Sequence, residues 1–115
     1  MPQDPLTIQE FEGPAEGQRI LKLVGPLTIT TLFDFQAKVR SDKSNALYLD
    51  FSGVPYIDSA GIGSLVGAYV NRDHTRSKLY LVGVNKRVQD AVEVTRVRQF
   101  FTFLESLPGA DGPSA

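Results

Sequence analysis

The segment from residue 46 to residue 70 constrains the fold more than any other part of the chain, because a strand pattern there runs directly into a helix pattern. Residues 46–51 are apolar and rich in strand-forming side chains, as in a buried segment of a sheet. Apolar side chains then recur at helical spacing, at Ile62, Leu65, Val66, Tyr69 and Val70. A strand followed by a helix that packs on it predicts an α/β fold, with Ser59 at the junction.

The residues before this segment predict an antiparallel hairpin and a first helix. Strand-like runs at residues 6–11 and 19–24 flank a turn rich in Gly and Pro. Thr31 and Asp34 resemble a capping box, with Asp in place of the usual Glu. The helix that follows ends near residue 40 and carries apolar side chains on one face, at Leu32, Phe35 and Val39.

The residues after the segment predict a strand, a third helix and a final short strand. Residues 78–84 have strand character, and Asn85 is a favourable N-cap. The expected third helix carries one apolar face, at Val88, Ala91, Val92 and Thr95. Residues 99–104 fit either a strand or a helical turn, and we favour a short strand at residues 101–104.

These elements run in the order β-β-α-β-α-β-α-β and predict a single α/β domain. The strand–helix–strand units favour parallel pairing with right-handed crossovers, while the hairpin adds an antiparallel strand. We therefore expect a mixed sheet of about four to five strands packed with helices. A length of 115 residues fits one such domain. We expect it to span residues 1–107, followed by a disordered tail at residues 108–115.

Composition excludes several functional classes. The formal net charge is −1, so charge gives no reason to expect direct binding of nucleic acid or of an anionic membrane. The chain has no Cys, which excludes disulfides and thiolate chemistry. Neither a signal peptide nor an apolar run of the roughly 18 to 20 residues that span a bilayer is present, so we expect a cytoplasmic protein. A local basic cluster forms either a docking edge or a solvated face, at Lys86, Arg87, Arg96 and Arg98.

Catalytic and cofactor motifs do not fit this chain. Gly61, Gly63 and Gly67 are spaced one residue too widely for the dinucleotide-binding fingerprint, and the P-loop pattern is absent. His74 is the only histidine, so a multi-histidine metal site is excluded. A nucleophile pair of Ser59 and His74 would have its members at opposite ends of one helix, about 20 Å apart. We therefore expect no enzyme activity, no cofactor and no metal.

Ser59 and the glycines after it each admit two interpretations. Ser and Asp are both favoured at helix N-caps, so one interpretation is that Ser59 only caps the helix. The other is that Ser59 is modified, because a helix N-terminus offers unbonded N–H groups and a positive dipole end to a phosphate. The glycines either pack closely against the sheet or admit a protein partner. In the second case Gly61 and Gly63 keep the first turn bare, and Gly67 serves packing.

The residues from Leu49 to Leu65 closely resemble the core of STAS domains, specifically those of bacterial anti-sigma factor antagonists. The Asp-Ser-x-Gly element is the specific part, and patterns at residues 23–27 and 79–88 extend the resemblance over most of the chain. It implies that Ser59 is phosphorylated by a serine kinase that is also an anti-sigma factor. Unphosphorylated, such an antagonist binds the anti-sigma factor and frees a sigma factor; phosphorylated, it lets go, and a serine phosphatase resets it. The residues expected to bind the partner are Gly25, Thr28, Asp58, Ser59, Ala60, Gly61, Ile62 and Gly63.

The chain departs from the family pattern at two places. Family members often carry an acidic residue just past the position of Gly25, where this chain has Pro26, Leu27 and Thr28. They also commonly end in an amphipathic helix, whereas this chain ends in a segment rich in Pro and Gly. Two other functions stay open on the residues alone. One is a constitutive STAS scaffold, or a subunit of a signalling assembly or transporter, in which Ser59 is only a cap; the other is a small-molecule or nucleotide-binding domain.

Overall fold

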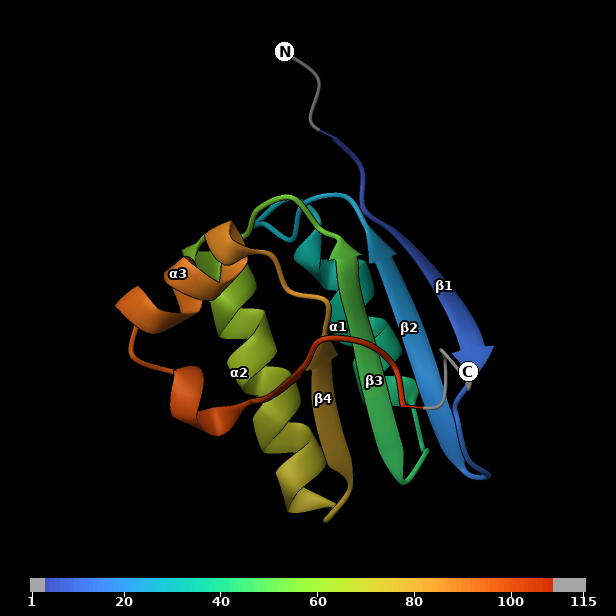
Figure 1. Cartoon of the computed structure of the whole chain (residues 1–115). Coiled ribbons are helices and arrows are strands. Elements are labelled where there is room, and N and C mark those ends of the chain that lie inside the picture. Colours follow the sequence, from blue (N-terminus) through green and yellow to red (C-terminus); the bar gives the residue numbers. More distant parts are fainter. Residues whose placement is uncertain (1–3, 109–115) are drawn as a thin grey trace.

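The computed structural model describes residues 4–108, which form five strands, three α-helices and one 3₁₀ turn (Figure 1). The elements are, in chain order, β1 (Thr7–Glu12), β2 (Gln18–Val24), α1 (Leu32–Ser41), β3 (Ala46–Gly53), α2 (Ser59–His74), β4 (Lys78–Val82), α3 (Lys86–Val94), the 3₁₀ turn η1 (Arg98–Phe100) and β5 (Thr102–Leu104). This order confirms the predicted succession of strands and helices, including the short final strand. The predicted tail lies outside the described residues, apart from Pro108.

The five strands form one mixed sheet in the order β1-β2-β3-β4-β5. β1 and β2 pair antiparallel as the predicted hairpin, and the later neighbours pair in parallel. Helices join the parallel strands, because such strands need a long crossover connection. The carboxyl ends of β2, β3 and β4 therefore lie at one edge of the sheet. The loops that precede α1, α2 and α3 leave from that edge, the upper one in Figure 1.

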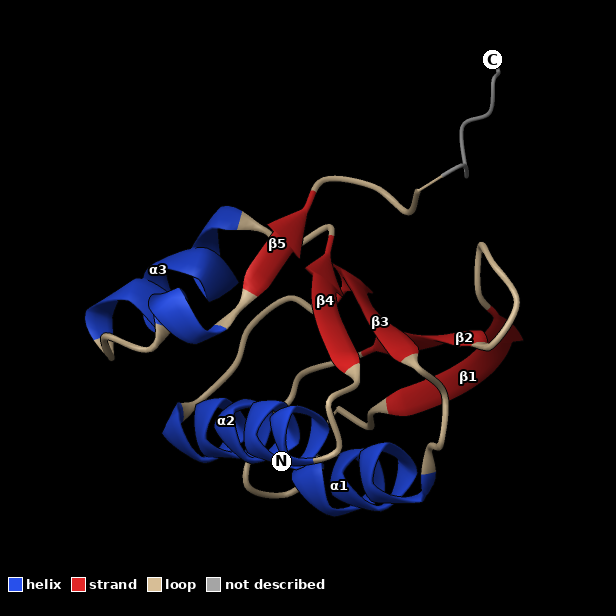
Figure 2. Cartoon of the chain, turned by 90° about the horizontal axis from the view of Figure 1, so that it is seen from below, coloured by secondary structure: helices blue, strands red, loops and turns tan. Residues whose placement is uncertain are grey.

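Helices α1 and α2 cover one face of the sheet (Figure 2). α1 buries its predicted face of Leu32, Phe35 and Val39. Alternate side chains of the strands meet this layer, as the two-residue period of a strand requires. The resulting core includes side chains that are at most 1% exposed, at Leu21, Leu23, Leu47, Leu49, Phe51, Leu65 and Leu81. α3 adds Val88, and it is capped as predicted, because the Asn85 side chain accepts a hydrogen bond from the Val88 N–H at 2.8 Å.

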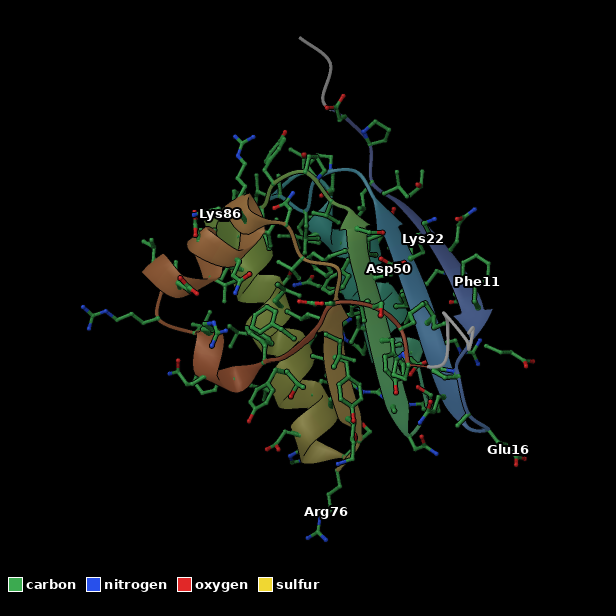
Figure 3. All side chains as sticks on the ribbon, viewed as in Figure 1. Phe11, Glu16, Lys22, Asp50, Arg76 and Lys86 are labelled. Carbon is green, nitrogen blue, oxygen red and sulfur yellow. The ribbon has the colours of Figure 1, made fainter. Side chains whose placement is uncertain are left out.

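The opposite face of the sheet has no covering helix in the described part of the chain (Figure 2). Tyr48 on β3 and Tyr80 on β4 stack there, with ring centroids 4.7 Å apart. The segment after β5 crosses this face in Figure 1 and packs Leu107 against the cluster that contains the buried Tyr48. Lys22 on β2 and Asp50 on β3, both labelled in Figure 3, are register partners, and their side chains lie on this same face of the sheet. An extended segment thus covers part of the surface that would otherwise need a helix.

A buried ion pair fixes the C-terminal end of α2. Arg72 is 2% exposed, and its Nη1 donates to Asp42 Oδ2 at 2.8 Å while its Nη2 donates to the backbone oxygen of Ser44 at 2.7 Å. Asp42 follows α1 and Ser44 precedes β3, so a single side chain connects α2 to the loop between those elements. Removing one partner of such a pair would leave an uncompensated buried charge, which makes the contact a strong positional constraint.

Two predicted details are wrong. The apolar stripe predicted for α2 includes Val70, but Val70 is 56% exposed, and Ala68 and Arg72 lie on the buried face instead. The aliphatic stem of an arginine can line a core when its charged end is paired, which an apolar count does not register. The strand predicted to reach residue 84 ends at Val82, because Gly83 has a φ of 68° and turns the chain there.

The environment of Tyr48 predicts an alkaline loss of stability. Burial, and then the neighbouring Tyr80, raise the pKa of Tyr48 above its ordinary value. The Tyr48 phenol therefore ionises more readily in the unfolded chain than in the folded one. The stability that the neutral phenol contributes is complete below about pH 10 and is lost as the pH rises further. We expect Tyr48→Phe to make the loss of stability above about pH 10 less steep. Urea unfolding at a series of pH values measures this, with Tyr69→Phe as control, and an unchanged slope in Tyr48→Phe would contradict it.

Candidate functional site

Asp58 is the residue that caps α2. Its backbone is extended, with φ −102° and ψ −178°, and its Oδ1 accepts a hydrogen bond from the Gly61 N–H at 2.8 Å. A side-chain oxygen in this position satisfies a first-turn N–H group that the helix itself leaves unbonded. The backbone oxygen of Asp58 also accepts from the Ile62 N–H at 2.9 Å. The interpretation of Ser59 as the helix cap is therefore wrong, because the preceding residue has that role.

The second oxygen of the same carboxylate joins α2 to the loop before α1. Asp58 Oδ2 accepts from the Ile29 N–H at 3.1 Å. Leu27 and Ile57 form an isolated parallel bridge between the same two loops, and the Asp58 N–H donates to the Leu27 oxygen at 3.3 Å. One side chain thus fixes both the start of a helix and the path of a loop that is distant in sequence.

The loop before α1 is also held by its own hydrogen bonds. Thr31 Oγ1 accepts from the Thr28 N–H and donates to the Pro26 oxygen, both at 2.9 Å. Because this hydroxyl bonds within the loop, it does not cap α1, and the predicted capping box with Asp34 is wrong. Gly25 begins the loop with a φ of 115°, a backbone conformation that residues with a Cβ rarely adopt. Gly25 and Thr28 therefore shape the loop next to the site.

Gly61 lies where α2 meets this loop. A Cβ at Gly61 would collide with the Leu27 carbonyl oxygen and lie 2.7 Å from Ile57 Cγ1. Close packing against a backbone therefore requires glycine here, and the packing interpretation applies. A Cβ at Gly63 or Gly67 would meet nothing within 4 Å. The expectation that Gly67 serves packing is wrong, whereas Gly63 does leave the exposed side of the helix bare.

Ser59 is the first residue of α2, and its side chain is exposed. The hydrogen bonds that organise the start of the helix run to Asp58 and leave the Ser59 hydroxyl uninvolved. This end of α2 carries the positive end of the helix dipole, which favours a negative charge placed beside it. The hydroxyl is thus accessible to an enzyme and lies where a phosphate would be tolerated.

An open groove of about 430 Å³ lies between the start of α2 and α3. Its walls are formed by Tyr56, Ile57, Asp58, Ser59 and Ile62 and by Arg87, Asp90, Ala91, Val94 and Thr95. The guanidinium carbon of Arg87 is 5.2 Å from the centroid of the Tyr56 ring. Lys86, labelled in Figure 3 at the start of α3, donates to Asp90 at 2.9 Å, and this hydrogen bond raises the pKa of Lys86. The groove therefore contains both Ser59 and an arginine whose guanidinium lies over an aromatic ring.

The residues expected to bind a partner lie together at this end of the molecule. Most of them are at the start of α2, namely Asp58, Ser59, Ala60, Gly61, Ile62 and Gly63. Gly25 and Thr28 lie in the adjoining loop, to which Asp58 is bonded. Thr28, Gly61 and Ile62 are buried and offer little surface, so direct contact would fall to the other members of the set.

Sequence reasoning missed several exposed apolar residues around Ser59. Ile29 is 56% exposed in the loop bonded to Asp58, and Val94 is 80% exposed on the groove wall formed by α3. A protein bound over this surface would remove both side chains from water, which favours association. The sequence did hold a signal in each case: Ile29 is an apolar residue in a predicted loop, and Val94 lies outside the predicted apolar face of the third helix.

The geometry bears on other chemistries as well. Ser59 and His74 are the first and last residues of α2, so they cannot form a nucleophile pair. Residues 4–108 contain no group of three or more acidic or histidine side chains placed to hold a metal ion. None of the helices formed by these residues combines the length and the apolar character needed to cross a bilayer.

The two glycines predict opposite effects of the same substitution. Gly61→Ala should destabilise the protein by about 1 to 3 kcal/mol, because its Cβ overlaps the Leu27 carbonyl. Gly63→Ala should stabilise it by about 0.5 to 1 kcal/mol, since the helix loses a flexible residue and the Cβ meets open space. Urea denaturation of both variants measures the difference. Similar effects of the two changes would be inconsistent with the close approach at Gly61.

Replacing the cap should cost more stability than replacing its neighbour. Asp58→Ala removes the acceptor for Gly61 and Ile29 and should lower the free energy of unfolding by about 1 to 2 kcal/mol. Ser59→Ala removes an exposed hydroxyl and should change it by less than about 0.5 kcal/mol. Thermal and urea unfolding compare the two variants. A larger loss of unfolding free energy in Ser59→Ala than in Asp58→Ala would indicate that Ser59 caps the helix.

Sequence comparison finds relatives among named regulatory proteins. The chain is 28% identical over 71 residues to the anti-sigma-B factor antagonist of Staphylococcus aureus strain NCTC 8325. The alignment covers 62% of this chain and 66% of that relative, so the chain spans just under two thirds of its length.

Solved structures have the same fold. An anti-sigma factor antagonist from Mycobacterium paratuberculosis matches with a TM-score of 0.78 and 18% identity, over 91% of this chain and 90% of the other. The murine anion transporter Solute Carrier 26 family member A9 matches with a TM-score of 0.73 and 18% identity, over 93% of this chain and 21% of the transporter. The sequence model of the STAS domain matches residues 8–110. The chain therefore belongs to the STAS domain family.

Proposed function

We propose that this protein is an anti-sigma factor antagonist whose binding to an anti-sigma factor is switched by phosphorylation of Ser59. The observation that carries the proposal is the exposed Ser59 hydroxyl at the first residue of α2, with Asp58 acting as the cap. A serine that is not needed for the fold is available for regulation. The relatives named as anti-sigma factor antagonists support the same choice.

The modification is compatible with the fold. A kinase would transfer the γ-phosphoryl group of ATP to Ser59 Oγ, with loss of the hydroxyl proton and release of ADP. The product carries about −1.5 to −2 charges at neutral pH. Repulsion from Asp58 opposes this charge, whereas the start of α2 favours it by about 0.3 to 1 kcal/mol. Because the Ser59 hydroxyl makes no hydrogen bond to another side chain or backbone group within residues 4–108, the domain should stay folded in both states.

A phosphate on Ser59 should affect the binding of a partner more than the stability of the domain. In its unphosphorylated form the surface around Ser59 offers exposed apolar side chains at Ile29 and Val94 and a bare turn at Gly63. A protein pressed against this surface would have to desolvate a phosphate placed in its middle. A loss of about 3 kcal/mol would weaken binding more than a hundredfold, so no large conformational change is needed.

The proposed cycle has three participants besides the domain. The anti-sigma factor is itself the serine kinase and is held by the unphosphorylated domain, which releases a sigma factor. A serine phosphatase restores the binding form. In this proposal the protein acts in the bacterial cytoplasm, without catalysis, a cofactor or direct contact with nucleic acid.

A binding assay with defined phosphorylation states tests the proposal. The protein is produced with serine or with phosphoserine at position 59 and titrated by calorimetry into an anti-sigma factor kinase encoded in the same genome. We expect phosphoserine to weaken binding by about a hundredfold or more and Ser59→Asp to weaken it in part. Ser59→Ala should bind as well as the parent. Ser106→Asp, at an exposed serine on the segment after β5, is the matched control and should have no effect.

The same assay distinguishes the alternatives. Binding that ignores the state of Ser59 would contradict the switch and favour a constitutive scaffold or subunit. Incubation with the kinase and ATP, followed by mass spectrometry, locates the modified residue. Phosphate found only at other serines or threonines would exclude Ser59 as the acceptor.

A further inference from the structure

We propose that Arg87 receives the phosphate on Ser59 and leaves the Tyr56 ring when the switch is set. The inference rests on the proposed phosphorylation of Ser59 and identifies the side chain through which the domain responds to it. Arg87 lies in the first turn of α3, and Ser59 begins α2, on opposite walls of one groove. Tyr56 lies three residues before Ser59 and holds the guanidinium carbon of Arg87 at 5.2 Å from its ring centroid.

Arg87 brings a positive charge to the groove and makes no ion pair with the acidic side chains of residues 4–108. It is the one Lys or Arg among the residues that line the groove. Its neighbour Lys86 is bonded to Asp90 at 2.9 Å, and Arg98 to Glu93 at 3.2 Å. Within residues 4–108, no carboxylate lies within ion-pair distance of the Arg87 guanidinium. A full positive charge is therefore available at the site.

The contact that Arg87 makes now is weaker than the one it would make with a phosphate. A guanidinium over a half-buried aromatic ring such as Tyr56 gains a modest electrostatic attraction. A guanidinium and a phosphate form two parallel charge-assisted hydrogen bonds, which are stronger and more directional. The contact with Tyr56 already places the guanidinium at the groove that Ser59 also lines, so the positive charge is there before the phosphate arrives. We therefore expect Arg87 to exchange the ring for the phosphate.

The acidic side chains at the groove would oppose a phosphate on Ser59, so a cation is needed there to offset the added charge. Asp58 and Asp90 both line the groove and would repel a phosphate on Ser59. Asp58 is bonded to two N–H groups and keeps its place, whereas Asp90 forms an exposed pair with Lys86. The loop before α1, residues 25–31, carries no charged side chain. Arg87 and the start of α2 are thus the groups that can offset the added charge.

The exchange would change the surface in two ways at once. The phosphate adds negative charge at the centre of the groove, and the departure of Arg87 uncovers one face of Tyr56. A partner that fits the unphosphorylated groove would meet a different shape as well as a different charge. Arg87 would accordingly couple the modification to the shape of the docking surface.

Titration of the phosphate tests the role of Arg87. Phosphoserine is incorporated at position 59 during translation, so neither kinase nor partner is required, and its second pKa is followed by ³¹P NMR. Arg87 should lower this pKa by stabilising the dianion, so Arg87→Gln should raise it by roughly 0.3 to 0.7 of a unit. Arg87→Lys should retain most of the lowering. Arg98→Gln is the matched control, because that guanidinium lies 5.4 Å from the Phe103 ring and outside the groove, and it should leave the pKa unchanged.

The outcomes separate this inference from the proposed function. An equal pKa in the parent and in Arg87→Gln, or an equal rise in Arg87→Gln and Arg98→Gln, would overturn the role of Arg87. Phosphorylation should also shift the ring proton signals of Tyr56 in the parent and much less in Arg87→Gln. Failure of either readout would leave the proposed release of the partner intact. A partner that remains bound to the phosphoserine protein would instead overturn the function, whatever the titration gives.

Discussion

The carboxylate of Asp58 is the contact on which the rest of the site depends. Its two oxygens accept from N–H groups of α2 and of the loop before α1, so they join two segments that meet only in the folded chain. Both acceptors are occupied by backbone, which gives the carboxylate a fixed orientation. The position of Ser59, one residue later, follows from that orientation. The hydroxyl proposed to be regulatory is thus placed by a neighbour and takes no part in its own placement.

This arrangement separates the residues that build the site from those that would signal. Asp58, Gly61 and Thr31 satisfy backbone groups or admit close packing, and each interacts mainly within the domain. Ser59 and Arg87 are exposed, and the fold does not rely on their polar groups. A modification at the second set can alter recognition while the first set keeps the geometry. Such a separation allows the modification to be added and removed without refolding the site.

Local patterns were enough to predict the elements of this fold. Strand and helix periods gave the correct order of elements, and Asn85 was correctly assigned as a cap because its signal lies within one turn. The choice between Asp58 and Ser59 was beyond such patterns, since both residue types cap helices and only the hydrogen bond from the Gly61 N–H to Asp58 decides. The roles of Gly61 and Arg87 could not be predicted from local patterns either. Gly61 packs against Leu27 and Arg87 lies over Tyr56, and each of these partners is about 30 residues away in the sequence.

The buried pair of Arg72 and Asp42 has a consequence for recognition. Together with the cap at the other end, it anchors α2 at both termini, so the helix has little freedom to tilt or slide. A partner would meet a platform that already has its bound form. Association then forfeits little conformational entropy on this side, and affinity depends on how well the incoming surface matches a rigid template.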